Sequence, residues 1–280
     1  MSGVSSGGPV STSGRVLSVR RVGSHHQLAL VAPGVAERFR PGALLAVGVG
    51  GPLSERCVPL GLPIYRVRVS GTYGGTVETV FDADGPATRW LAEAPAGTTL
   101  RVTGPLGRPY ALPKDPVTCL LVGESAAAAP LFALAERLRE RGCVVHMVLG
   151  AATDADLFGA LDARRSTRGV TVTTRDGSVG TAGTVLDVLP DVLDRIDAEV
   201  VYAATSNVTA HGVARLAEEH GAWSQTAVGF PLTCGTGLCQ GCMVPVVGED
   251  AVARTVRGCV DGPVFRGDRV RWDELAGQRA

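Results

Sequence analysis

The sequence predicts a multidomain β plus α/β protein: an antiparallel β-barrel domain, then a doubly wound domain with a parallel sheet, then a small cysteine-containing module. Three observations predict this order. Short apolar runs separated by turn residues fill residues 15–114. Strand-like and helix-like patterns then alternate over residues 115–223, as in parallel α/β sheets. The alternation ends there, and residues 224–280 hold three cysteines within nine positions.

Residues 15–114 are expected to form the barrel, because short strands at close intervals are typical of antiparallel barrels and sandwiches. One helix interrupts them: Asp84 or Gly85 caps it, Pro86 suits its first turn, and it covers Ala87–Ala94. Residues 1–14 are rich in serine and glycine and lack an apolar period, so we expect a disordered tail there. The expected strands are Arg15–Arg21, Gln27–Ala32, Ala43–Gly50, Pro63–Val69, Thr76–Phe81 and Thr98–Thr103.

Residues 115–223 open with Val117–Val122, a continuous apolar run of the kind found in strands that are buried on both faces. The helix expected after it covers Ala127–Arg141. The same alternation then repeats, which predicts a doubly wound parallel sheet. The further strands and helices are expected, in order, at Cys143–Leu149, Asp154–Ala163, Val170–Thr174, Thr184–Leu193, Glu199–Ala204 and Thr209–His220.

The charge and hydropathy of the chain argue against two classes of partner. The 27 basic and 27 acidic residues balance without a basic stripe, which argues against nucleic acid. No apolar run reaches the length of a membrane span, and the N-terminus lacks a basic-then-apolar signal pattern. We therefore expect a cytoplasmic protein that does not enter membranes. In that compartment the seven cysteines are expected to be ligands or core residues rather than disulfides.

Four cysteines near the C-terminus form the most specific motif of the chain. Cys234, Cys239 and Cys242 follow the spacing C-x4-C-x2-C, and Cys259 lies downstream. This is the plant-type arrangement for a [2Fe-2S] cluster, which needs four thiolates. A structural zinc site is one alternative, although zinc modules usually present two separated C-x2-C pairs and only one is found here. Ordinary buried thiols are the other, although a segment with three cysteines and three glycines makes a poor core.

The glycines of this segment suit a loop that closes around a cluster. Glycine permits positive φ, and without side chains the peptide N–H groups can point at the sulfurs and offset the cluster's negative charge. Leu238 is placed to screen the cluster from water. The glycines are Gly235, Gly237 and Gly241.

The order of β-domain, α/β domain and cysteine module resembles the ferredoxin–NADP reductase superfamily. Within it, the chain is most similar to the electron-transfer subunits of dihydroorotate dehydrogenase B, the NAD⁺-dependent class 1B enzymes. The segments Cys234–Cys242 and Arg257–Phe265 carry this resemblance most specifically. A full plant-type ferredoxin domain would need more residues than remain in the last module, which argues against the dioxygenase reductases.

The resemblance implies an oxidoreductase component of pyrimidine biosynthesis. In the family, a catalytic FMN subunit oxidises dihydroorotate, and electrons pass singly through the [2Fe-2S] cluster to FAD, which passes hydride to NAD⁺. The resemblance further implies a catalytic flavoprotein partner and a heterotetramer of two catalytic and two electron-transfer subunits. Two alternatives stay open. One is a divergent paralogue with an impaired NAD(H) site that serves another oxidoreductase, and the other is a non-redox stabilising subunit with a structural cluster.

The resemblance also implies FAD in the β-domain. The family's R-P-x-S-like strand should lie at Pro63–Val67, but in the best register a proline stands at the hydroxyl position and the arginine is missing. Proline offers the flavin neither a hydroxyl nor an N–H, whereas Tyr65 is suited to pack on flavin or ribose. Two later family turns match Tyr73–Thr76 and Gly104–Gly107, unless these are only turns. The flavin-binding candidates are therefore Pro63, Ile64, Tyr65, Gly74, Gly75 and Thr76.

The nucleotide loop departs further from the family. Where the family has G-G-G-x-G-x-A-P, the segment Gly123–Pro130 reads G-E-S-A-A-A-A-P, so only the first glycine and the final Ala-Pro remain. A helix N-terminus binds phosphate when its N–H groups are unobstructed. The methyl groups of Ala126 and Ala127 hinder that approach, and the Glu124 carboxylate competes for the same helix end. The family's Cys-Gly-Pro element also reads Ala204–Ser206 here. Either alanine is tolerated and nicotinamide still binds, or the NAD(H) site is lost or changed.

Overall fold

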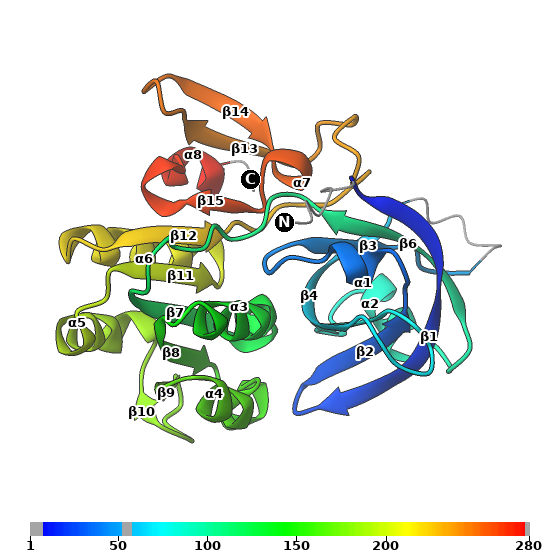
Figure 1. Ribbon diagram of the computed structural model, residues 1–280, viewed down its shortest axis with the longest axis horizontal. Coiled ribbons are helices and arrows are strands. Elements are labelled where there is room, and N and C mark those ends of the chain that lie inside the picture. Colours follow the sequence, from blue (N-terminus) through cyan, green and yellow to red (C-terminus); the bar gives the residue numbers. More distant parts are fainter. Residues whose placement is uncertain (1–7, 52–57, 278–280) are drawn as a thin grey trace.

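The structure is a computed structural model that describes residues 8–51 and 58–277, and it confirms the predicted fold class (Figure 1). A closed six-stranded antiparallel barrel lies beside a seven-stranded, mostly parallel sheet. A small C-terminal part, drawn at the top of Figure 1, contacts both of them.

The barrel closes in the order β1-β2-β5-β4-β3-β6. Apolar side chains such as Leu28, Leu45 and Ile64 fill its interior and are fully buried. Side chains of successive strand residues point to opposite faces, so every second residue reaches this core. The strands are β1 (Val10–Val22), β2 (His25–Val31), β3 (Leu44–Val47), β4 (Leu60–Arg68), β5 (Thr76–Phe81) and β6 (Thr99–Leu106).

The first strand begins earlier than the sequence predicted. The disordered tail expected over residues 1–14 is wrong for residues 10–14, which belong to β1, whereas residues 1–7 lie outside the described part of the chain. Ser11 pairs with Thr103 of β6, and Gly14 pairs with Leu100. Backbone pairing satisfies these peptide groups. Because most of the side chains of residues 10–14 are small or polar, no apolar period marks the strand.

Two short helices accompany the barrel. Helix α2 (Pro86–Ala92) begins as predicted, with Gly85 as its cap and Pro86 in its first turn. Helix α1 (Val35–Arg38) has only four residues and was not predicted. Its N-terminus is closed by the side chain of Glu37, which accepts a hydrogen bond from the N–H of Gly34.

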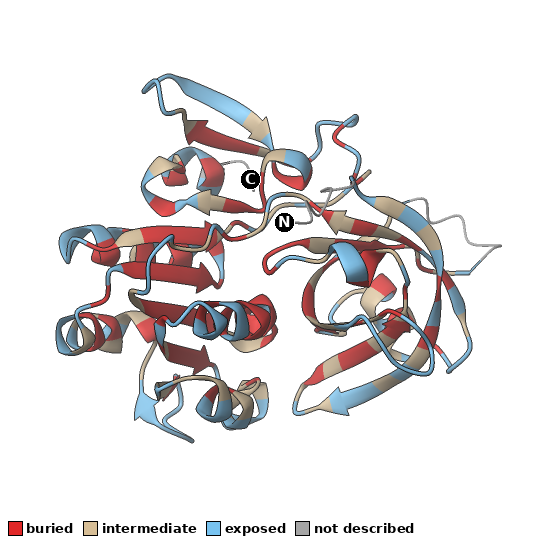
Figure 2. Ribbon diagram, viewed as in Figure 1, coloured by how far each residue is buried: buried red, intermediate tan, exposed pale blue. Residues whose placement is uncertain are grey.

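The second sheet runs in the order β10-β9-β8-β7-β11-β12-β15. Its central strand β7 (Thr118–Glu124) is buried on both faces, as the apolar run predicted. Figure 2 shows buried residues concentrated in this sheet and inside the barrel. The other strands are β8 (Val144–Ala151), β9 (Gly169–Thr174), β10 (Thr181–Ala182), β11 (Val200–Ala204), β12 (Trp223–Ala227) and the antiparallel β15 (Val264–Arg266).

Two helices cover each face of this sheet. Helices α3 (Ala129–Glu140) and α4 (Ala160–Ser166) cover the face toward the barrel, and α5 (Val185–Ile196) and α6 (Asn207–Glu219) cover the other. Within the described ranges, no helix is long and apolar enough to cross a membrane.

The helix expected over Asp154–Ala163 is wrong in its first half. A short 3₁₀ turn, η2 (Asp154–Asp156), stands there, and α4 begins only after Gly159. Leu157 is extended and Gly159 has a φ of 74°, so the backbone leaves the helical region between the two elements.

The C-terminal part is continuous with the sheet. Strand β12 spans the boundary that the sequence placed between residues 223 and 224, and β15 pairs with it. The buried side chains of β12 are polar, namely Ser224, Gln225 and Thr226, which is why the apolar alternation ends before this strand. The remaining elements are β13 (Met243–Val247), β14 (Ala253–Arg257), α7 (Gly258–Asp261), η3 (Gly267–Arg269) and α8 (Trp272–Gly277).

Candidate metal centre

The four predicted cysteine ligands come together as two pairs. Cys242, just before β13, and Cys259, in the first turn of α7, lie with their sulfurs 3.3 Å apart, and each residue is 2% exposed. Cys234 and Cys239 lie in the loop between β12 and β13, where the thiol and backbone N–H of Cys239 interact with the Cys234 sulfur. Cys239 is exposed and Cys234 is half-buried.

Backbone N–H groups point at these sulfurs. The N–H of Thr236 lies 3.3 Å from the Cys234 sulfur, and that of Gly241 lies 3.3 Å from the Cys239 sulfur. Hydrogen bonds from Thr236 and Cys239 lower the pKa of Cys234 to about 5. Burial and the neighbouring Cys242 raise the pKa of Cys259 to about 12. Cys234 therefore ionises readily, whereas Cys259 needs a nearby positive charge such as a metal to do so.

This donor set fits a two-iron cluster. In a [2Fe-2S] centre with four cysteine ligands, two thiolates bind each iron, and the chain supplies them as Cys234 with Cys239 and Cys242 with Cys259. Over the residues that the structure describes, no three His, Cys, Asp or Glu side chains are gathered so as to hold one metal ion. The arrangement thus disfavours the alternative of a single tetrahedral zinc, which takes its ligands at one centre.

The conformation of the loop follows the predicted glycines in part. Gly235 and Gly237 have φ values of 69° and 80°, whereas Gly241 does not take positive φ and Gln240, with a φ of 56°, does. A Cβ at Gly237 would lie 2.6 Å from the side chain of Val260, next to the fourth ligand. Leu238 is 84% exposed, and its expected screening of the cluster stays a prediction.

The cysteine loop and α7 pack directly on the barrel. A Cβ at Gly235 would lie 3.1 Å from Leu106 at the end of β6. One residue on, Gly107 lies so close to the carbonyl of Gly262 that a Cβ would overlap its oxygen. The N–H of Arg108 donates a hydrogen bond to the same carbonyl. The segment Gly104–Gly107, which is the end of β6 and the residue after it rather than a free turn, therefore fixes the segment that carries Cys259.

A cavity of about 540 Å³ lies between the barrel and this loop. Gly235, Thr236, Cys259 and Leu106 are among the residues that line it. None of the six flavin candidates lines this cavity.

Comparison with known proteins identifies the family. Residues 232–271 match the family model of the iron–sulfur cluster binding domain of dihydroorotate dehydrogenase B. The chain is 30% identical over 245 residues to the dihydroorotate dehydrogenase B (NAD(+)) electron transfer subunit homolog of Thermotoga maritima, which covers 87% of this chain and 82% of that protein. It is 31% identical over 251 residues to the corresponding subunit of Bacillus caldolyticus, with 88% and 92% covered. The chain belongs to the dihydroorotate dehydrogenase B electron-transfer subunit family.

Solved structures agree with this membership. The structure of an NADH-dependent reduced ferredoxin-NADP oxidoreductase, studied for flavin-based electron bifurcation, superposes with a TM-score of 0.83 at 27% identity. It covers 95% of this chain and 92% of that chain. A ferredoxin NADP⁺ reductase from Neisseria gonorrhoeae with bound FAD and NADP superposes with a TM-score of 0.62 at 14% identity, over 79% of this chain and 99% of that one. The fold is thus that of FAD-binding reductases.

The six flavin candidates of this family member form two groups, and neither group lines the cavity beside the cysteine loop. Pro63, Ile64 and Tyr65 lie in β4, where Ile64 points into the barrel core and Tyr65 is 2% exposed. Gly74, Gly75 and Thr76 form the other group, in the turn between β4 and β5 and at the start of β5. A Cβ at Gly75 would lie 2.8 Å from Ala36 of α1, so this glycine serves packing within the barrel. Gly74 has a φ of 74° and open space around it.

The nucleotide loop of the family folds here into a compact 3₁₀ turn, η1 (Ser125–Ala128). Ala126 and Ala128 are buried, and a Cβ at Gly123 would lie 2.6 Å from the Cβ of Ala128. Of the two methyl groups expected to obstruct a phosphate, that of Ala126 faces inward and that of Ala127 is exposed.

The segment Ala204–Ser206, which replaces the family's Cys-Gly-Pro element, and the residue after it form their hydrogen bonds within the chain. The side chain of Ser206 accepts a hydrogen bond of 3.2 Å from the N–H of Thr209 and so caps α6. Asn207 exchanges two hydrogen bonds, of 2.9 and 2.8 Å, with the backbone of Gly229. The sequence could not reveal this second pairing, because the two residues are distant along the chain.

Proposed function

We propose that this chain is the iron–sulfur electron-transfer subunit of a dihydroorotate dehydrogenase-like complex in the cytoplasm, acting in pyrimidine biosynthesis. Its partner in this proposal is a catalytic flavoprotein that oxidises dihydroorotate, and the two form a heterotetramer. The observation that carries the proposal is the assembly of the four cysteines as two pairs. Membership of the family and the matched cluster-binding segment support it.

The four cysteines are the residues that would hold the cluster, and when bound it supplies one-electron chemistry. The backbone N–H groups of Thr236 and Gly241 stabilise negative charge on the outer sulfurs. Burial of Cys242 and Cys259 keeps water from the inner pair. Leu238 and Cys239 face solvent at the tip of the loop, which suits a surface that docks a redox partner.

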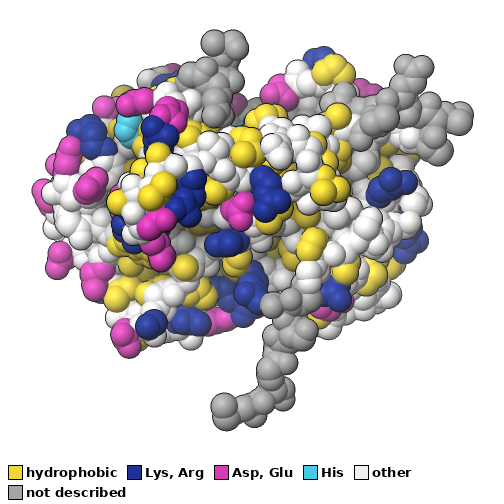
Figure 3. All heavy atoms as spheres, turned by 90° about the horizontal axis from the view of Figure 1, so that it is seen from above, with side chains coloured by type: hydrophobic (Ala, Val, Ile, Leu, Met, Phe, Trp, Pro, Cys, Tyr) yellow, Lys and Arg dark blue, Asp and Glu magenta, His cyan; other side chains and the backbone are white. Residues whose placement is uncertain are grey.

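The surface around this loop fits a protein partner better than a polyanion. On the face seen in Figure 3, basic and acidic side chains are interspersed, with scattered apolar side chains among them. The formal net charge of zero agrees with this mixture. Interspersed charges give specificity to protein docking without general attraction to phosphate.

The proposal leaves FAD and NAD(H) out. Tyr65, the candidate suited to pack on a flavin, is buried, and so is Ala126 of the altered nucleotide loop. The cysteine pairs are formed by other residues, so the proposal does not depend on the flavin or nucleotide sites.

The test uses the full chain, purified anaerobically by itself and together with a co-expressed catalytic flavoprotein of the proposed kind. Iron and labile sulfide are counted, and the visible and electron paramagnetic resonance spectra are recorded before and after dithionite. We expect a [2Fe-2S] signal that dithionite reduces and that dihydroorotate reduces only when the catalytic subunit is present. A chain without iron contradicts the proposal. A cluster that dithionite cannot reduce would instead support the non-redox stabilising subunit.

A further inference from the structure

We infer that the cleft between the barrel and the α/β domain is closed in this chain by its own side chains, so that neither a flavin ring nor a nicotinamide ring enters it. The family resemblance predicts a flavin on the barrel side and a nicotinamide nucleotide on the α/β side. This inference deepens the proposed function, on which it rests: the electron-transfer subunit carries no hydride chemistry of its own, and the cysteine loop is its redox centre.

Three aromatic rings fill the centre of the cleft. Tyr65 of β4 packs edge-on against Phe132 of α3 and Phe158 before α4, with ring centroids 5.5 and 5.2 Å apart. Phe132 and Phe158 are themselves in edge-on contact, with centroids 5.6 Å apart. All three are at most 4% exposed. Tyr65 and Val80 of the barrel thus belong to the same hydrophobic core as α3 and the sheet.

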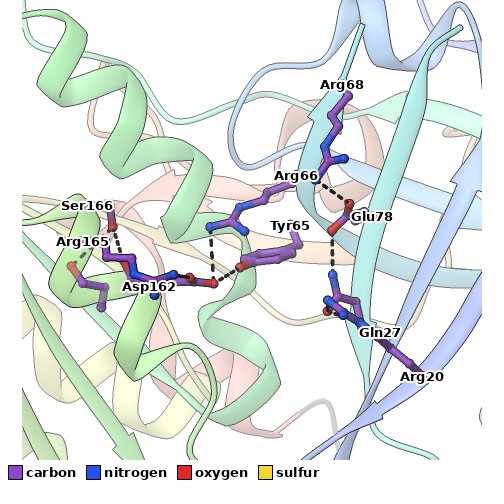
Figure 4. Close-up of polar contacts among 10 residues, drawn as sticks. Arg20, Gln27, Tyr65, Arg66, Arg68, Glu78, Asp162, Arg165 and Ser166 are labelled. Carbon is purple, nitrogen blue, oxygen red and sulfur yellow. Dashed lines mark hydrogen bonds and ion pairs between the residues drawn. The ribbon is translucent and has the colours of Figure 1, made fainter. Parts of the chain in front are cut away.

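A polar network seals one side of these rings (Figure 4). The Tyr65 hydroxyl donates a hydrogen bond of 2.8 Å to Asp162 of α4. Arg66 reaches the same carboxylate at 3.4 Å, and its guanidinium carbon lies 4.6 Å from the centre of the Tyr65 ring. Arg165 approaches Asp162 at 3.8 Å from within α4. The Tyr65 ring is thus in contact with two phenyl rings and one guanidinium, which occupy the space that a flavin would need in order to stack on it.

A second polar network joins the two domains farther along the cleft. His25 of β2 bonds through Nδ1 to Asp82 and through Nε2 to the carbonyl of Asp156 in η2, the latter at 2.8 Å. The hydroxyl of Ser24 donates a 2.6 Å hydrogen bond to the Asp156 carboxylate. The imidazole also meets Phe158 edge-on, with centroids 6.2 Å apart. The two networks therefore hold opposite ends of one aromatic cluster.

On the α/β side of the cleft, the described residues form a compact turn where the family has its phosphate-binding loop. The turn η1 packs against β5 of the barrel as well as against β7 and β8. Ala126 and Ala128 of this turn are buried, and Ser125 takes a φ of 47°. A pyrophosphate at a helix N-terminus needs free N–H groups that it can approach closely. Here the barrel contacts η1 directly before the helix begins, and Glu124 immediately precedes η1.

The same anaerobic preparation tests the inference through flavin and nicotinamide. The full chain is mixed with excess FAD, desalted, and analysed by chromatography that separates FAD from the partner's FMN, and NADH is then added while the cluster absorbance is followed. We expect iron without FAD, and a cluster that dithionite bleaches but NADH does not. FAD bound in a one-to-one ratio, or bleaching by NADH, overturns the inference. Iron counts test the proposed function separately. A chain that binds neither iron nor FAD contradicts the proposed function but does not contradict the closure of the cleft.

Hydrogen–deuterium exchange tests the closure itself. Peptides covering β4, η1, α3 and α4 are expected to exchange at the same rate with and without FAD or NADH. Tyr65→Ala should speed exchange in η2 and α4 several-fold because it removes the central ring and the bond to Asp162. Tyr73→Ala is the matched control, since Tyr73 is 54% exposed and lies outside the cleft. Protection of these peptides by either nucleotide, or equal behaviour of the two variants, contradicts closure.

Discussion

The hydroxyl of Tyr65 donates a 2.8 Å hydrogen bond to Oδ2 of Asp162, and the two residues are 97 positions apart in the chain. The bond ties the barrel to α4 at the closed cleft. Tyr65→Phe keeps the ring and removes only this bond, so we expect a loss of about 1 kcal/mol in the free energy of unfolding. Urea unfolding of the full chain measures it.

A double-mutant cycle shows whether that loss of stability comes from the interaction between Tyr65 and Asp162. Tyr65→Phe combined with Asp162→Asn should cost less than the sum of the single changes, with a coupling energy of about 0.5–1.5 kcal/mol. Tyr73→Phe, which alters an exposed hydroxyl, should change stability by less than about 0.5 kcal/mol. Strict additivity of the Tyr65 and Asp162 changes would show that the bond does not couple the domains.

His25 makes the stability of the same interface depend on pH. Burial by itself lowers the pKa of His25, but the hydrogen bonds to Asp82 and to the Asp156 carbonyl outweigh it and raise the pKa above 6.5. The protonated imidazole is thus favoured in the folded chain. Its contribution is fully present below pH 6.5 and is lost as pH rises through the folded-state pKa.

We therefore expect the difference in unfolding free energy between the native chain and His25→Gln to shrink as pH rises above 6.5. Comparing the two chains cancels the contributions of other titratable groups to the pH dependence of stability. One of these groups is His146, whose pKa is lowered by burial and by nearby Arg168 and Arg195. Asp82→Asn should flatten the same pH dependence. A difference that grows with pH contradicts this account.

Local patterns in the sequence were sufficient for elements whose burial is apolar and periodic. The run Val117–Val122 predicted a strand buried on both faces, and the cysteine spacing predicted which thiols meet. The pattern failed where burial is polar, as in β12, or where the strand is ordered by backbone pairing alone, as in residues 10–14 of β1. Neither signal is carried by side-chain hydropathy.

The environment of Tyr65 could not be predicted, because it is created by residues from other parts of the chain. Read within its own strand, Tyr65 is an aromatic residue well placed to pack on a flavin. In the fold, its ring meets Phe132 and Phe158, and its hydroxyl meets Asp162. Long-range pairing of this kind decides between a binding residue and a packing residue, and the spacing of neighbours along the sequence does not contain it.

Gly107 links the barrel to the fourth cluster ligand. It has a φ of 78°, and a Cβ there would overlap the backbone carbonyl of Gly262, three residues after Cys259. Gly107→Ala should therefore displace α7 and lower iron content. Gly97→Ala is the control: its φ is 91° but no atom lies within 4 Å, so it carries only the left-handed backbone cost of about 1–2 kcal/mol. Iron per chain and the melting temperature separate the two effects, and equal iron content in both variants would argue against the link.

Replacing a buried ligand should abolish the cluster. Cys242→Ser removes one thiolate of the inner pair, and we expect iron content and the visible absorbance to fall to near background. Cys143→Ala removes a buried thiol of the α/β core, so it should cost about 1 kcal/mol of stability and leave iron unchanged. Loss of iron in both variants would mean that the cluster reports general folding rather than ligation.

Leu238 is expected to contact the catalytic partner, because it is 84% exposed in the cysteine loop beside the exposed Cys239. An exposed apolar side chain next to a redox centre is expected to bury itself in the partner. Leu238→Asp should leave iron content and dithionite reduction unchanged but weaken binding to the catalytic subunit by about 1–2 kcal/mol, that is, roughly five- to thirty-fold. Val208→Asp, on α6 and 78% exposed, is the matched control and should bind normally. Binding is measured by titrating the labelled chain with its partner. If both variants bind as the native chain does, the partner docks elsewhere, and electrons must reach the cysteines from another side of the loop.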